Sequence, residues 1–252
     1  MMDFSDKHIV VTGGGSGIGA SIATAFAAAG GTVSILGRRM DPLEQLADKI
    51  GATPVICDVT QRDSVNQALA TARAANGPVH TAIANAGSAK SKAFARMSVD
   101  DLNDMLNVNL VGVFNFWQAC LADMQAAGGG RLIAIASIAG LKGMSNVSGY
   151  CAAKHGVVGL TRALALELAL SDITVNAICP GYIKTPLVTG AIEAITAKTG
   201  KSAETVANNM IAGNPQGRFI SVEEVASAAL WLASEGAASV NGHALAISGG
   251  EI

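Results

Sequence analysis

The chain has 252 residues, of which 50% are apolar and 14% are charged, and its formal net charge is −2. This length and apolar content suffice for a large α/β domain with a sizeable core, whereas the charged fraction lies well below the roughly 25% of an average soluble domain. The small net charge and the lack of a Lys/Arg cluster argue against nucleic acid or a membrane as a partner.

Location and metal binding are constrained by the start of the chain and by its cysteines. Met1–Asp6 lacks the basic and apolar regions of a signal peptide, and the longest apolar run, Leu132–Leu141, is too short to span a bilayer. The four cysteines and four histidines show no metal-ligand spacing. We therefore expect a cytoplasmic protein with reduced cysteines and no metal site.

Strand-like and helical patterns alternate from the N-terminus onward. His8–Thr12 reads as a buried strand, and a glycine-rich turn leads from it into an apolar-periodic helix over Ile18–Ala29. Seven strands with helical crossovers predict a single α/β domain over residues 1–252, with a doubly wound parallel sheet and helices on both faces. The further strands are expected at Thr32–Leu36, Thr53–Cys57, Val79–Asn85, Arg131–Ala136, Ile173–Cys179 and Ala244–Ile247.

The least regular stretch of the chain lies between Pro186 and Gly217, after the sixth strand. Ligands of open α/β sheets bind on this side. A substrate loop over 187–214, closing as a lid, and an ordinary helical insertion are the two interpretations.

The turn after the first strand, Thr12–Gly19, reads TGGGSGIG. Backbone N–H groups and the positive helix end can hold a pyrophosphate at this place, and glycines let the backbone approach it closely. A structural tight turn would use the same residues, but the position after the first strand of a βαβ unit favours a dinucleotide site. The expected contacts are Gly13, Ser16, Gly17, Ile18 and Gly19.

The end of the second strand bears on the choice of cofactor. Enzymes that prefer NAD usually place an acidic residue there for the ribose hydroxyls, and here the position is Gly37, followed by Arg38 and Arg39. Either arginine would give a 2'-phosphate a charge-assisted partner. NADP(H) is favoured, NAD(H) is the alternative, and solvated arginines at a helix start are the structural interpretation.

Tyr150 and Lys154 are four residues apart in a helical pattern that continues to Leu170, so their side chains share one face. A free tyrosine has a pKa of about 10, which is too high for a base near neutrality. A nearby ammonium group favours the phenolate. The pair is therefore a candidate acid/base unit, although a tyrosine and a lysine at this spacing are also common on surface helices.

These motifs together resemble the classical short-chain dehydrogenase/reductase family, including its 3-oxoacyl reductases and 3-hydroxybutyrate dehydrogenases, over practically the whole chain. The turn matches the family's TGxxxGIG, and Asn85-Ala86-Gly87 matches the end of its NNAG motif, with Ala84 in place of the first asparagine. The resemblance implies a single-domain Rossmann fold.

The resemblance also implies a catalytic set. Ser137, thirteen positions before Tyr150, would polarise the substrate carbonyl, and Tyr150 would exchange the proton. Lys154 would lower the pKa of the tyrosine and bind the nicotinamide ribose. Asn109 would anchor a water in a proton relay, with Asn107 as an alternative for that role.

Further cofactor contacts follow from the same resemblance. Asp58 would bind the adenine ring beside Val59. Ile183 and Thr185, after the Pro-Gly turn, would contact the nicotinamide carboxamide. The complete implied set beyond the glycine-rich turn is Arg38, Arg39, Asp58, Val59, Asn85, Ala86, Gly87, Tyr150, Lys154, Pro180, Gly181, Ile183 and Thr185.

The expected function is that of an NAD(P)-dependent oxidoreductase that interconverts a secondary alcohol and a ketone. The segment Asn214–Arg218 looks like segments of 3-oxoacyl reductases, which suggests a 3-oxoacyl or 3-hydroxyacyl substrate, with a cyclic or aryl-alkyl one as the alternative. A non-catalytic NAD(P)-binding sensor is the competing function. A sugar-nucleotide epimerase is disfavoured by the length of the chain.

A homotetramer is expected from the low charged fraction and from the family. The helices near Asp101–Met124 and Gly149–Leu170 would form its contacts, together with the last strand. Ala163, Ala165 and Ala169 would permit close helix packing between subunits, although packing within one chain explains the same alanines.

Overall fold

The computed structural model describes residues 2–252. Its centre is one seven-stranded sheet in the order β3-β2-β1-β4-β5-β6-β7, and all neighbouring strands are parallel. The strands are β1 (His8–Thr12), β2 (Thr32–Gly37), β3 (Thr53–Ile56), β4 (Thr81–Ala84), β5 (Gly129–Ile135), β6 (Asp172–Pro180) and β7 (Ala244–Ile247).

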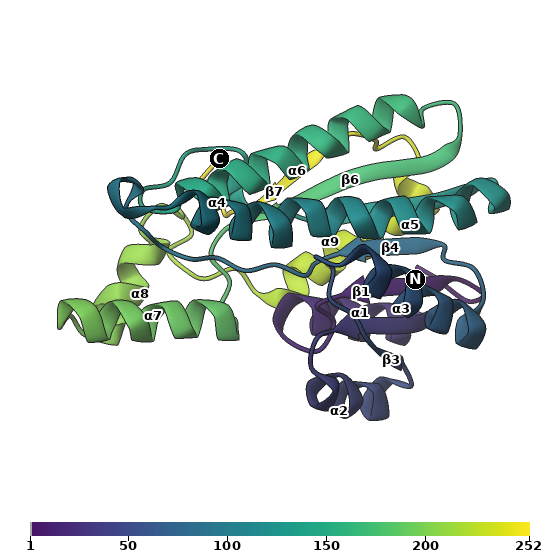
Figure 1. The fold of residues 1–252 in the computed structure, drawn as a ribbon, viewed down its shortest axis with the longest axis horizontal. Helices are drawn as coiled ribbons and strands as arrows, with labels where there is room; N and C mark the ends of the chain where they lie inside the picture. Colours follow the sequence, from purple (N-terminus) through teal and green to yellow (C-terminus); the bar gives the residue numbers. More distant parts are fainter. Residues whose placement is uncertain (1) are drawn as a thin grey trace.

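Helices connect the strands and cover both faces of the sheet (Figure 1). They are α1 (Gly17–Ala28), α2 (Met40–Ile50), α3 (Arg62–Asn76), α4 (Val99–Leu106), α5 (Gly112–Ala127), α6 (Ser148–Glu167), α7 (Pro186–Thr199), α8 (Ala203–Ile211) and α9 (Val222–Ala233). The predicted seven-stranded parallel α/β fold is confirmed.

Two apolar clusters hold the layers together. On one face Phe26 of α1 and Leu232 of α9 are buried, and on the other Phe116 and Trp117 of α5 are buried. Strands covered on both faces need apolar side chains in succession, which is why β1 and β4 read as uninterrupted apolar runs.

The strand boundaries differ from the expected ones by up to two residues. β5 begins at Gly129 rather than Arg131, because Gly129 and Gly130 pair with Asp172 and Ile173 of β6. β4 begins at Thr81, and the N–H of His80 just before it already donates to the His8 carbonyl oxygen, whereas the N–H of Val79 donates to the Asp123 carboxylate.

A continuous helical segment, Val99–Ala127, contains α4, the π-helical turn η2 (Asn107–Val111) and α5. It is 29 residues long and contains an 18-residue stretch with a mean hydropathy of 1.2, so by length and composition it could cross a membrane. Polar residues interrupt the segment, so it contains no long uninterrupted apolar run. In the fold, Phe116, Trp117 and Cys120 of this segment are buried against the sheet, which accounts for its apolar composition.

The irregular stretch after β6 folds into the helices α7 and α8, which lie beside each other away from the sheet (Figure 1). The stretch is therefore helical, and both interpretations, a lid over the substrate and an ordinary insertion, remain predictions. Ile183 and Ile220, at the two ends of the insertion, form an isolated parallel bridge and are buried at 4% and 2% exposure.

Candidate active site

The glycine-rich turn leaves no space for side chains where it joins β1 to α1. Gly13 and Gly17 have φ angles of +64° and +54°, which favour glycine. A Cβ atom on Gly19 would lie 2.3 Å from the Gly13 carbonyl oxygen. Ser16 is the N-cap of α1, yet its side chain makes no capping hydrogen bond. The helix therefore begins with unsatisfied N–H groups at a backbone that an anion can approach closely.

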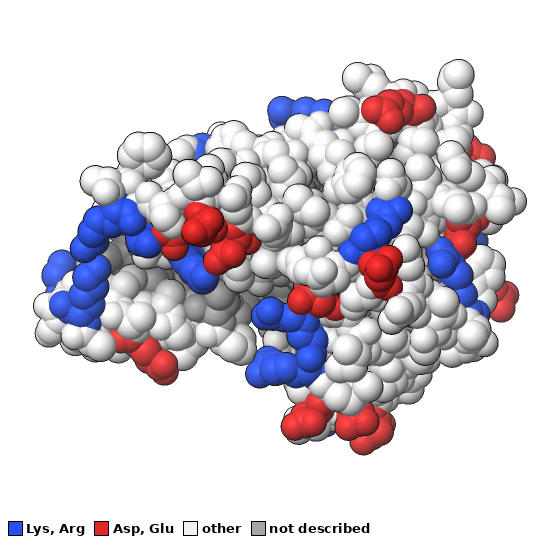
Figure 2. All heavy atoms as spheres, viewed as in Figure 1, with Lys and Arg blue, Asp and Glu red and all other residues white. Residues whose placement is uncertain are grey.

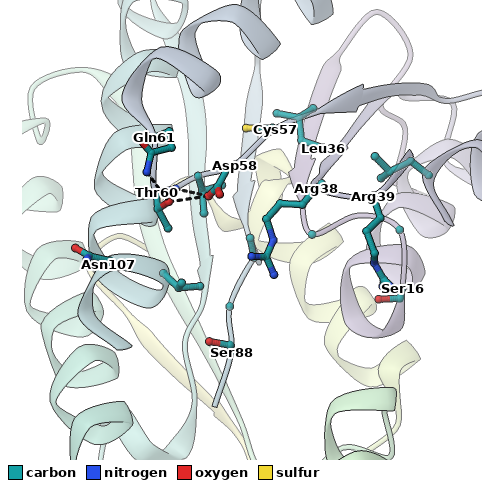
Figure 3. A pocket seen from close by; sticks show the side chains of 18 of the residues that line it. Ser16, Leu36, Arg38, Arg39, Cys57, Asp58, Thr60, Gln61, Ser88 and Asn107 are labelled. Atoms are coloured by element: carbon teal, nitrogen blue, oxygen red, sulfur yellow. Dashed lines mark hydrogen bonds between the residues drawn. The ribbon is translucent and has the colours of Figure 1, made fainter. Parts of the chain in front are cut away.

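A cavity of about 880 Å³ opens beside this turn, where β1, β2, β3 and β4 end. Figure 3 shows Arg38 and Arg39 extending into it from the end of β2, with Asp58 on the opposite side. The residues of the predicted set that line it are Gly13, Ser16, Arg38, Arg39, Asp58, Val59, Ala86 and Gly87.

The charged side chains of this cavity differ in whether they already have hydrogen-bond or ion-pair partners. Arg38 and Arg39 are exposed, and within residues 2–252 neither forms an ion pair or a side-chain hydrogen bond. Asp58 accepts hydrogen bonds from the backbone N–H and the hydroxyl of Thr60 through Oδ1, at 3.0 and 2.8 Å. The two guanidinium groups are thus available to an anion.

A second cavity of about 230 Å³ continues the first, because both are lined by Gly13, Ser16 and Gly87. Asn109, Tyr150 and Lys154 line only the smaller one. The fold therefore brings residues from the turn after β1, from η2 and from α6 together at one end of an elongated hollow. Asn107 lies apart from them, on the wall of the larger cavity.

Lys154 is buried at 4% exposure in the middle of α6. Its Nζ donates to the Ile135 carbonyl oxygen at 2.8 Å and lies 5.7 Å from the centre of the Tyr150 ring. A Cβ atom on Gly87 would be 3.8 Å from the same Nζ. Burial lowers the pKa of this ammonium group from 10.5 to about 8.

The pKa of Tyr150 is shifted in the direction opposite to the expected one. Burial raises the pKa of its phenol to about 12, while a hydrogen bond with Ser137 acts in the opposite direction. The expected lowering by Lys154 does not occur in the protein alone, because its ammonium group, with a pKa of about 8, has lost its proton before a phenol with a pKa of about 12 ionises. In the protein alone the phenol is therefore a proton donor at neutral pH.

Asn109 is fully buried in the π-helical turn and connects it to the segment after β4. Its Nδ2 donates to the carbonyl oxygens of Ser88 and Met105 at 2.9 and 3.0 Å, and its Oδ1 accepts from the Ser88 N–H at 3.2 Å. These bonds fix Gly87 and Ser88 beside Lys154. Asn85 likewise fixes the glycine turn, since its Nδ2 donates to the carbonyl oxygens of Thr12 and Gly13.

Some predicted contacts lie outside the walls of the two cavities. Ser137 reaches the site through its bond to Tyr150, and Gly19 supports the turn from behind. Thr185 lines the smaller cavity, and its hydroxyl also caps α7. Pro180, Gly181 and Ile183 lie on the segment that leads to it.

Several lining residues were missed by sequence reasoning. Ser88, Thr60 and Lys90 line the larger cavity. Each lies one or a few residues beyond a motif, in a loop whose course is set by tertiary contacts such as the Asn109–Ser88 bonds. No pattern in the sequence marks them.

Comparisons with known proteins agree with this geometry. A family model described as short chain dehydrogenase matches residues 7–196. The chain is 36% identical to D-beta-hydroxybutyrate dehydrogenase of Rhizobium meliloti (strain 1021), over 97% of this chain and 98% of that protein. It is 32% identical to 3-oxoacyl-(acyl-carrier-protein) reductase of Chlamydia muridarum (strain MoPn / Nigg), over 97% of each.

A solved structure of a reductase is also similar to this chain. A variant of actinorhodin polyketide ketoreductase with NADPH has a TM-score of 0.94 at 33% identity, covering 98% of each chain. The relatives named here are dehydrogenases and reductases, and their names give no support to a non-catalytic sensor. The chain therefore belongs to the short-chain dehydrogenase family and is an NAD(P)-dependent oxidoreductase that interconverts a secondary alcohol and a ketone.

Proposed function

We propose that Ser137, Tyr150, Lys154 and Asn109 reduce a ketone at the smaller cavity, with NADPH as the preferred cofactor. The observation that carries this is the continuity of the two cavities. An elongated dinucleotide fits a hollow whose middle is the glycine turn, with the free arginines at one end and Tyr150 at the other. The nicotinamide would supply the hydride.

Each catalytic residue then has a role that its surroundings support. Ser137 and Tyr150 would bind the ketone oxygen, and the phenol would release its proton to the alkoxide that forms there. A pKa of about 12 keeps the phenol protonated at neutral pH, which suits reduction. Lys154 would bind the ribose hydroxyls, and the buried ammonium group would favour the phenolate left after proton release.

Asn109 would act as a positioning residue. Both of its side-chain donors are used by Ser88 and Met105, so the side chain holds the backbone beside Lys154. A relay water, as the family resemblance implies, would be held by its backbone carbonyl in the π-helical turn.

The preference for NADPH rests on Arg38 and Arg39. An NADPH 2'-phosphate beside two guanidinium groups that are free of ion pairs gains charge-assisted hydrogen bonds, whereas NADH offers no such anion. Asp58, whose Oδ1 is occupied by Thr60, would receive the adenine amino group through Oδ2. The remaining cofactor contacts are those predicted from the sequence.

The substrate class follows from the relatives named above, which act on hydroxybutyrate, 3-oxoacyl and polyketide compounds by their names. A 3-oxoacyl compound is proposed, with a cyclic or aryl ketone as the alternative. The insertion of α7 and α8 begins at Thr185, on the wall of the smaller cavity, and would cover the substrate as the expected lid.

A homotetramer is also proposed. Leu166, at the end of α6, and Leu170, three residues beyond the helix, are exposed at 80% and 106%, and Phe114 is exposed at 45% on α5. Most of the face in Figure 2 carries neither acidic nor basic residues. Ala163 and Ala169 are exposed and available to a neighbouring subunit, whereas Ala165 is buried within its own chain. The cytoplasmic location and the single-domain boundary stay predictions.

The test is oxidation of NADPH and of NADH, followed by absorbance of the reduced nicotinamide, against 3-oxoacyl esters, cyclic ketones and aryl ketones. Tyr150→Phe should lower kcat by about 10³-fold or more while NADPH still binds. Arg38→Ala/Arg39→Ala should raise the KM for NADPH about 10-fold or more and leave the KM for NADH within about twofold. Turnover that survives in Tyr150→Phe would contradict the catalytic role of Tyr150. An equal rise in the KM for NADPH and the KM for NADH in Arg38→Ala/Arg39→Ala would contradict the cofactor preference.

A further inference from the structure

The proposed reaction leaves one buried carboxylate without a role. Glu251 follows β7, its side chain is 8% exposed, and its Oε1 accepts a hydrogen bond from Lys142 Nζ at 2.7 Å. Lys142 is 37% exposed and lies five residues after Ser137, on the segment that leads to Tyr150. The two residues are 109 positions apart in the sequence and form an ion pair only in the folded chain.

Glu251 contacts the segments that surround the substrate side of the site. Its Oε2 lies 3.8 Å from the place where a Cβ atom on Gly181 would stand, in the turn after β6. Its Oε1 lies 2.7 Å from the corresponding place on Gly213, after α8. One carboxylate thus binds Lys142 and lies close to the Pro-Gly turn and to the end of the α7–α8 insertion.

The pair lies outside the walls of the two cavities but beside segments that lead into the smaller one. Lys142 follows Ser137 on the segment that leads to Tyr150, and Gly181, beside Glu251, is four residues before Thr185, which lines the smaller cavity. Tyr182, whose pKa is raised by burial and by the charge of Glu251, adjoins Gly181. A substrate whose far end leaves the smaller cavity along these segments would meet Lys142 and Glu251.

We propose that Lys142 and Glu251 are specificity-determining residues, and that their ion pair selects ketones whose far end is uncharged, such as esters and thioesters, over free carboxylates. The inference rests on the proposed function. A substrate carboxylate could bind Lys142 only by displacing Glu251, which would leave a nearly buried carboxylate unpaired, at a high cost. An ester or thioester requires no such exchange.

The test compares acetoacetate with methyl acetoacetate, which differ in charge at the end away from the ketone. The quantity measured is the ratio of kcat/KM for the acid to kcat/KM for the ester, at saturating NADPH. The unmodified protein should prefer the ester. Glu251→Gln leaves Lys142 without a partner and should raise the ratio about 10-fold, whereas Lys142→Gln leaves Glu251 unpaired and should lower it. The double variant should return to within about twofold of the original ratio.

Opposite changes of the ratio in the two single variants separate a role in specificity from a structural role. A pair that only stabilised the fold would, when broken, reduce kcat/KM for the acid and for the ester alike. Asp123→Asn is the matched control. It breaks the Arg73–Asp123 pair, which joins α3 to α5 and whose carboxylate is 14% exposed, and should leave the ratio unchanged. Lys142→Gln tests the inference even if Glu251→Gln is too unstable to assay.

The outcomes distinguish this inference from the proposed function. Turnover of ketones with an unchanged ratio in both single variants, or a preference of the unmodified protein for the acid, would overturn the role of the pair alone. Absence of turnover with every ketone and both cofactors would overturn the proposed function and this inference with it.

Discussion

Replacing the buried Lys154 by methionine should stabilise the cofactor-free protein at neutral pH while abolishing activity. Burial lowers the pKa of Lys154 from 10.5 to about 8. At 1.36 kcal/mol per pH unit, this difference corresponds to a cost of about 3 kcal/mol for the charged form in the folded state. Loss of the hydrogen bond to the Ile135 carbonyl returns about 1 kcal/mol, so Lys154→Met should raise the free energy of unfolding by about 2 kcal/mol.

The direction in which stability changes with pH follows from the number of protons bound in the folded and unfolded states. Below about pH 8 the lysine is protonated in both states and the folded state bears the full cost. Between about pH 8 and 10.5 only the unfolded state keeps the proton, so the stability of the unmodified protein rises with pH. The advantage of Lys154→Met should therefore shrink across this interval and be gone above it.

Thermal unfolding by calorimetry, at equal protein concentration and several pH values, measures the difference. For a chain of this length about 2 kcal/mol corresponds to a rise in Tm of about 4–8 °C at pH 7. Lys49→Met, at an exposed site on α2, is the control and should change Tm by less than about 2 °C. A lower Tm for Lys154→Met, or an advantage that does not vary with pH, would refute the argument.

Three further predictions concern the glycine-rich turn, the hydroxyl of Ser137 and the oligomeric state. Gly19→Ala places a Cβ atom 2.3 Å from the Gly13 carbonyl oxygen and should weaken NADPH binding at least about 10-fold in a fluorescence titration, whereas Gly190→Ala, with open space around it, should not. Ser137→Ala should lower kcat about 10²-fold with the KM for NADPH unchanged, and an unaltered kcat would remove Ser137 from the mechanism. Leu166→Asp/Leu170→Asp should lower the sedimenting mass without loss of helical circular dichroism, and an unchanged mass would place the interface elsewhere.

The periodicity of the sequence was sufficient for the fold. Uninterrupted apolar runs such as β1 and β4 occur where a strand is covered on both faces, so the parallel sheet followed from local pattern. The start of β5 at Gly129 did not follow, because its two glycines have no strand preference and are fixed only by pairing with β6.

The sequence predicted candidate residues that the fold brings together at one cavity, but it did not predict their electrostatics. The spacing of Tyr150 and Lys154 on α6 follows from the helical repeat, whereas the rise in the tyrosine pKa depends on burial by segments distant in sequence. The Lys142–Glu251 pair joins residues 109 positions apart, and neither lies in a motif. Such pairs require the tertiary structure.

The bridge between Ile183 and Ile220 has a consequence for protein engineering. It closes the base of the α7–α8 insertion within the body of the domain, so the ends of the insertion are fixed whatever lies between them. We therefore expect the insertion to be exchangeable as a unit. Grafting the corresponding segment of another family member between these two residues should change α7 and α8 while the glycine turn and the arginines of the larger cavity stay in place.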